Sequence, residues 1–239
     1  MGVRERPDTD PGTGADVKRG AAGRSYDPDR LFLHPDDDLA PNRPGETLRA
    51  GLDASRTGRW SLLLARLLGR HPVEDAWRRA LAAEQLVGAA LEALTPGGWE
   101  VLHSVVLPGD AVVSHLLIGP GGVFCIHTEP VRRAGPVRVD EAFVRAPGER
   151  HPRPVVRWAR QSAARCAPVL ARGCGFPVRV RGMVVLVGAS EVAAPGDDDV
   201  AVLMERQVAG LGMLGGVLRP ERVDRVHTVA RNRRVWLGC

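Results

Sequence analysis

The stretch HLLIGPGGVFCI, from His115 to Ile126, joins two apolar runs through a Gly-Pro-Gly-Gly turn at residues 119–122. Short apolar runs bounded by turn residues are typical of strands that are covered on both faces of a sheet. A glycine-rich connection between two such runs predicts a β-hairpin rather than a phosphate-binding loop, because no Lys-Ser/Thr ending or helix follows it. We therefore expect strands at 111–118 and 123–128, paired at the centre of a buried sheet.

The segments around this hairpin alternate between helical and strand patterns. A helix at 73–94 with a stop signal at 95–98 precedes a strand at 99–107, so three consecutive strands form an antiparallel meander. The segments that follow predict a weaker strand pair within 137–145, a helix at 155–172, strands at 178–187 and 200–204, and helices to residue 231. This order favours a mixed α/β fold in which helices flank a central sheet.

The N-terminal part of the chain has a different composition. Residues 1–48 are rich in Pro, Gly and Asp, carry 7 basic and 10 acidic side chains, and predict a disordered acidic tail. Residues 49–72 predict an amphipathic helical segment, with apolar side chains at helical spacing between Trp60 and Leu68. We expect the folded domain to occupy 73–239, with its core at 77–187.

Composition excludes several classes of protein. The four cysteines have no metal-ligand spacing, so we expect reduced thiols, and no apolar run predicts a signal peptide or a membrane span. We therefore expect a cytoplasmic protein without membrane association. The net charge of +5 contains an excess of about +8 on residues 49–239, which is compatible with a polyanionic partner but does not require one.

Residues 77–161 resemble the nuclease-related domain (NERD) family, a branch of the restriction-endonuclease-like PD-(D/E)xK phosphodiesterases. The resemblance rests on HLLIGPGGVFCI at 115–126, on WEVLHSVVLPG at 99–109, and on Gln161-Ser162 where the family has Gln-Ala. It also places Glu84 on the family's helix glutamate. The resemblance implies a restriction-endonuclease-like fold with a central mixed sheet.

The same resemblance implies metal-assisted hydrolysis of phosphodiesters, with site positions at Glu84, Ser114, His127, Glu129 and Gln161. Three of these depart from the family pattern, because Ser114 replaces Asp, His127 replaces an acidic residue and Glu129 replaces Lys. A hydroxyl and an imidazole are poor ligands for Mg²⁺, and a carboxylate cannot take the role of a cation beside a phosphate. We therefore expect a catalytically degenerate site.

A metal site built from the remaining residues is an alternative. His127 and Glu129 share one face of their strand, and Glu84 would join them if its helix packs as in the family. These three residues could hold Mn²⁺ or Zn²⁺; otherwise Glu129 begins an exposed loop and His127 is a half-buried imidazole. We expect no cofactor in a degenerate site, and a divalent metal, Mg²⁺ or Mn²⁺, only in an active one.

Arginines crowd the stretch that follows the site strand. We single out five of them as candidate contacts to nucleic-acid phosphates: Arg132, Arg133, Arg138, Arg157 and Arg160. A solvated basic face in an arginine-rich protein is the competing interpretation. Single-strand binders also use aromatic stacking, for which this stretch offers Phe143 and Trp158.

Three functions remain open on the sequence alone. The first is a degenerate nuclease-like module that binds nucleic acid or a protein partner. The second is an active metal-dependent nuclease with a rebuilt site, and the third is a structural or regulatory interaction module. The sequence leaves the oligomeric state and the preference for DNA or RNA open.

Overall fold

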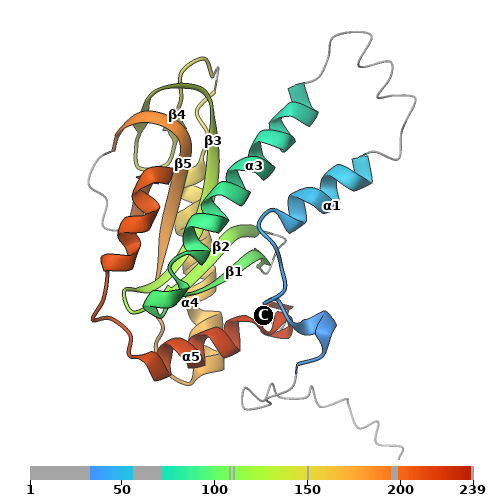
Figure 1. Cartoon of the computed structure of the whole chain (residues 1–239), viewed down its shortest axis with the longest axis vertical. Helices are drawn as coiled ribbons and strands as arrows, with labels where there is room; N and C mark the ends of the chain where they lie inside the picture. Colours follow the sequence, from blue (N-terminus) through green and yellow to red (C-terminus); the bar gives the residue numbers. More distant parts are fainter. Residues whose placement is uncertain are drawn as a thin grey trace, which may run out of the picture.

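A computed structural model describes residues 33–55, 72–107, 109, 111–149, 151–194 and 199–237, and Figure 1 shows its arrangement. In chain order the elements are the short 3-10 helix η1 (Pro35–Asp37), α1 (Glu46–Ser55), α3 (Pro72–Glu92), η2 (Thr95–Gly97), β1 (Glu100–Val106), β2 (Val112–Gly119), β3 (Gly122–Val139), β4 (Val144–Arg145), α4 (Val155–Cys174), β5 (Val180–Ala193), β6 (Val200–Met204), η3 (Glu205–Met213), α5 (Pro220–Ala230) and α6 (Arg233–Leu237).

The strands form one six-stranded mixed sheet in the order β1-β2-β3-β5-β6, with β4 paired to β3. β1, β2 and β3 are antiparallel neighbours, whereas β5 and β6 join in parallel orientation. Gly119 pairs with Gly122, so Pro120 and Gly121 form the turn of the predicted hairpin. Gly122 has a φ of 122°, which side chains rarely tolerate. The predicted meander and mixed α/β fold are confirmed.

Helices cover both faces of this sheet. α3 lies in front of the sheet in Figure 1 and α4 lies behind it. Along β3 the side chains alternate, so that Phe124 and Ile126 pack with the α3 residues Val87 and Leu91, whereas Cys125 packs with residues of α4 and α5. The central strands are therefore buried on both sides, as their continuous apolar runs indicate.

β3 is much longer than the sequence pattern predicts. The strand runs for 18 residues, well beyond the expected end at residue 128, although it contains Pro130 and Pro136. Its second half pairs with β5 after an irregular stretch between Pro130 and Gly135, and its last residues pair with β4. Because Val137 pairs with Val192, 55 positions further along the chain, a local pattern cannot show this extension.

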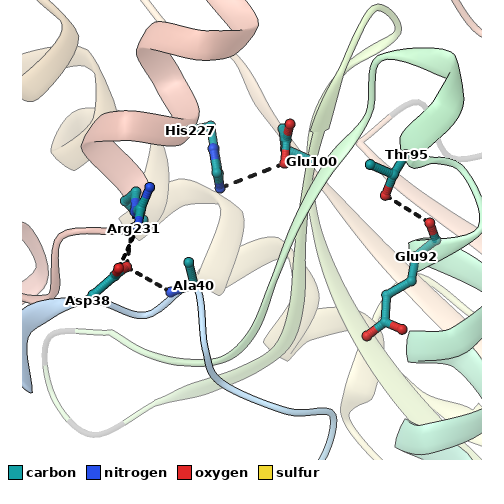
Figure 2. Close-up of polar contacts among 7 residues, drawn as sticks. All are labelled: Asp38, Ala40, Glu92, Thr95, Glu100, His227 and Arg231. Atoms are coloured by element: carbon teal, nitrogen blue, oxygen red, sulfur yellow. Dashed lines mark hydrogen bonds and ion pairs between the residues drawn. The ribbon is translucent and has the colours of Figure 1, made fainter. Parts of the chain in front are cut away.

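Part of the predicted N-terminal tail belongs to the folded domain, which corrects the boundary at residue 48. Leu39 is buried, and its backbone N–H donates a 2.8 Å hydrogen bond to the carbonyl of Arg231. The Arg231 guanidinium pairs with Asp38, whose Oδ1 also accepts from the N–H of Ala40 at 3.0 Å (Figure 2). The partner comes from the far end of the chain, so local composition conceals this contact.

The predicted amphipathic segment at 49–72 is described only in part. Its first residues continue α1, which begins at Glu46, whereas Trp60 to Leu68 lie outside the described residues. The predicted helix at 73–94 is α3, and it starts one residue earlier. Among the helices that the structure describes, none combines the length and the apolar character needed to cross a bilayer.

Candidate functional site

Glu84 and Ser114 form a buried pair beneath α3. Ser114 Oγ donates a 2.9 Å hydrogen bond to Glu84 Oε1 and accepts one from the Thr128 backbone N–H at 3.2 Å. Glu84 is 8% exposed, and this burial raises the pKa of its carboxyl group, against the opposing effect of the Ser114 hydroxyl. Within the described residues, Glu84 Oε2 has no hydrogen-bond partner. The Glu84–Ser114 pair thus contains one carboxyl group, and burial disfavours its charged form.

A second polar set lies next to this pair, also beneath α3. His103 Nδ1 and His115 Nδ1 are 2.8 Å apart, and His103 Nε2 lies 3.0 Å from Glu92 Oε1. Desolvation lowers the pKa of both imidazoles, most strongly for the fully buried His115. Both rings are therefore held in the neutral form near pH 7.

His127 turns to the other side of the sheet and contacts α4. Its Nε2 lies 3.0 Å from the hydroxyl oxygen of Ser162, which is itself buried. Burial lowers the pKa of His127 to about 4, so its ring is neutral near pH 7. The residue that we expect at the family's acidic position therefore carries no charge near pH 7.

Glu129, the residue that we expect at the family's lysine position, is ion-paired with Arg153. Arg153 Nε also donates to Glu149 Oε2 at 3.0 Å, and its Nη2 donates to the Pro130 carbonyl at 3.1 Å. Both carboxylate side chains are largely buried, at 12% exposure for Glu129 and 9% for Glu149. The Glu129 carboxylate is thus committed to one internal cation and does not begin an exposed loop.

A pocket of about 380 Å³ separates β2 and β3 from α4. It brings together three of the five predicted site residues, His127, Glu129 and Gln161. The other residues that line it are Ala111, Val112, Thr128, Val155, Trp158, Ser162 and Arg165. The predicted site positions on β3 and α4 therefore line one pocket.

The predicted metal set does not assemble. Glu84 contacts Ser114 on the α3 side, whereas His127 and Glu129 contact Ser162 and Arg153 on the α4 side. In the described part of the chain, no three His, Cys, Asp or Glu side chains are placed to hold a metal ion together. A hydroxyl, a neutral imidazole and an ion-paired carboxylate do not fit the oxygen-ligand set that Mg²⁺ prefers.

The five predicted phosphate-binding arginines divide between two regions. Arg132, Arg133 and Arg138 are exposed on the second half of β3, and Arg138 lies directly opposite the exposed Arg145 of β4. On α4, Arg157 lies 6.0 Å from the centre of the Phe143 ring, and Arg160 donates to the Glu141 carbonyl at 3.0 Å. Like charges in directly opposed positions destabilise a strand pair, so the Arg138–Arg145 pair is an unusual feature of this edge.

Arg153 and Ser162 are the partners that sequence reasoning did not connect with the site. A signal for Arg153 is present, since Glu149 and Arg153 stand four residues apart and form an ion pair at 2.9 Å. Its pairing with Glu129 spans 24 residues and appears only in the folded chain. Ser162 is visible in the sequence only as the residue after Gln161.

The mixed sheet with a helix on each face defines the class as an α/β domain. Residues 79–187 match the sequence model of the nuclease-related domain, NERD, which confirms the predicted family. This segment runs from α3 through the first part of β5 and includes all five predicted site residues. Neither a curated protein nor a solved structure shows significant similarity to the chain.

Proposed function

We propose that this nuclease-related domain binds nucleic acid without cleaving it. The observation that carries the proposal is the commitment of Glu129 to Arg153, because it places a neutralised carboxylate where the family's chemistry needs a free cation. Hydrolysis of a phosphodiester by the family's route also needs carboxylates that hold a divalent metal. Ser114 and the neutral His127 supply none.

The binding half of the proposal rests on the edge formed by β3 and β4. Arg138 and Arg145 face each other there, and Arg145 is only loosely associated with Asp140, at 3.7 Å. Within the described residues Arg138 has no ion-pair partner, so an external anion would relieve the repulsion between the two guanidinium groups. Phosphate oxygens are suitable anions, because arginine binds them in a bidentate manner.

This basic edge is connected to the pocket. Val144 of β4 forms a β-bridge with Arg153, the residue that pairs with Glu129 at the pocket, and α4 begins two residues later. A polyanionic chain that contacts Arg138 and Arg145 therefore lies near the N-terminal end of α4, where Arg157 is exposed. These contacts are to phosphates and carry no sequence information by themselves.

The test combines a cleavage assay with a binding assay on the purified full chain. We expect no cleavage of single-stranded or duplex DNA or RNA in the presence of Mg²⁺ or Mn²⁺. We also expect an affinity for these nucleic acids that falls steeply with salt, because phosphate contacts release condensed counterions. Cleavage that disappears in Glu84→Ala would overturn the proposal, and negligible binding at low salt would favour a protein partner instead.

A charge-matched control separates specific contacts from net charge. The double variant Arg138→Ala/Arg145→Ala should bind more weakly and reduce the slope of log K against log salt by about 1 to 2. The double variant Arg179→Ala/Arg233→Ala removes the same charge from exposed positions at the other end of the sheet and on α6, and should bind almost as the wild type does. Equal losses in the two variants would contradict a role for the β3–β4 edge.

A further inference from the structure

Trp158 is an exposed aromatic side chain at the mouth of the pocket. It lies on α4 and is 46% exposed, although a tryptophan ring is among the most costly side chains to leave in water. Residues three, four and seven positions after it, Gln161, Ser162 and Arg165, line the same pocket. At this helical spacing their side chains lie on one face of α4, so the indole stands beside a row of polar groups.

The opposite wall of the pocket comes from β2 and β3 and is neutral in charge. His127 is uncharged near pH 7, and its Nε2 is occupied by Ser162, so the rest of the ring is presented as a flat neutral surface. The negative charge of Glu129 is compensated by Arg153. Ala111, Val112 and Val155 add apolar contacts. The pocket therefore combines an aromatic ring, apolar side chains, a few hydrogen-bonding groups and the guanidinium of Arg165.

This combination selects a flat ligand with a polar edge. The exposed Gln161 amide at this pocket can bond a polar ligand edge, which a purely apolar side chain would not provide. A planar heterocycle can stack on the indole of Trp158 and use the amide at its edge. The volume of about 380 Å³ lies in the range of about 300 to 1,000 Å³ that is typical of small-ligand sites.

We propose, on the basis of the nucleic-acid function above, that this pocket takes one unpaired nucleobase of a single strand, stacked on Trp158. A base inside a duplex cannot present its face to an indole, whereas an unpaired base can. Arg157, the exposed residue that precedes Trp158 on α4, is available to a backbone phosphate next to that nucleotide. The ligand class is therefore single-stranded nucleic acid, in preference to duplex.

The experiment measures binding of a fluorescently labelled mixed-sequence single strand and of the matching duplex to the full chain. Trp158→Ala should weaken single-strand binding by about 5- to 100-fold, which is the loss expected for one stacked base, and should leave duplex binding almost unchanged. Trp158→Phe should retain most of the affinity, because it keeps a ring. The dependence of affinity on salt should be the same in all variants, since no phosphate contact is removed.

Two further measurements keep the inference testable. Trp158→Leu keeps apolar bulk without a ring, so it should bind as weakly as Trp158→Ala, and equal melting temperatures would show that both variants are folded. A single strand that contains 2-aminopurine should lose fluorescence on binding to the wild type and not to Trp158→Leu, because stacking quenches this base.

The outcomes separate this inference from the proposed function. Salt-dependent binding that is equally strong in wild type, Trp158→Ala and Trp158→Leu would overturn the base pocket and leave the arginine-mediated binding intact. The absence of any salt-dependent binding would overturn both. A loss in Trp158→Leu that is equal for the single strand and the duplex would also contradict a pocket for an unpaired base.

Discussion

Ser114 Oγ lies 2.9 Å from Glu84 Oε1, so a hydroxyl donates to the buried acid at the residue where we expect the family's aspartate. The pair joins α3 to β2 through a hydrogen bond in a buried place. This hydrogen bond gives one oxygen of the buried Glu84 carboxyl group a partner inside the protein. It also makes the effect of restoring the family residue predictable.

Ser114→Asp should destabilise the protein at pH 7, by about 1 to 3 kcal/mol, because it places a second carboxylate against Glu84 and removes the donor. Two such groups share a proton, so the folded state binds more protons than the unfolded state and the loss should shrink toward pH 5. Urea denaturation at both pH values measures this difference. Ser114→Asn is the neutral control, and a loss that does not depend on pH would contradict the argument.

Glu84→Gln should leave stability at pH 7 unchanged or slightly higher. Burial raises the pKa of Glu84, so folding at pH 7 carries the cost of holding the charged form inside. That cost appears as pH rises from the pKa of Glu84 in the unfolded state to its higher pKa in the folded state. The amide in Glu84→Gln does not titrate, so the variant does not carry this cost. The amide oxygen can still accept from Ser114. Thermal melts from pH 5 to pH 8 should show a flatter profile for the variant, and a marked loss of stability in Glu84→Gln would refute this view of the site.

Acid should destabilise the domain below about pH 6.5 through His127. Its pKa is lowered to about 4 in the folded state, so the unfolded state binds more protons and stability falls as pH decreases from 6.5 toward 4. The full effect amounts to about 3 kcal/mol for a group that is lowered this far. The buried His103 and His115 act in the same direction.

His127→Gln should remove part of this acid dependence, because an amide can keep a hydrogen bond to Ser162 and does not titrate. Denaturant unfolding followed between pH 4 and pH 7 gives the comparison, with the exposed His151→Gln as a control that should follow the wild type. If His127→Gln and the wild type lose stability with the same pH profile, His127 does not contribute in the way its burial indicates.

Arg153→Ala should cost about 3 kcal/mol of stability, at the low end for a broken internal ion pair because the guanidinium is partly exposed. The variant leaves the carboxylates of Glu129 and Glu149 close together without their shared cation. Adding Glu129→Gln should recover a clear part of the loss. A double-mutant cycle by urea denaturation measures the coupling, and additive losses would mean that Glu129 and Arg153 do not stabilise each other.

The hairpin at 115–126 shows how much of the fold local pattern can predict. Its apolar runs and its glycine turn identify β2, the start of β3 and the buried centre of the sheet, because continuous burial and tight turns depend on neighbouring residues. The extension of β3 to Val139 and the docking of Leu39 depend on β5 and on Arg231. Contacts between residues so far apart in the sequence produce no periodic pattern of apolar residues in either segment.

The candidate site divides in the same way. The amino-acid sequence by itself determined which chemical groups are present, a hydroxyl at 114, an imidazole at 127 and a carboxylate at 129, and hence the expectation of a degenerate site. Only the tertiary structure decided which side chain each of these groups contacts. Glu84 contacts Ser114, and Glu129 contacts Arg153. Because α3 and α4 pack on opposite faces of the sheet, each buried polar group has to form its hydrogen bond or ion pair with a partner on its own face.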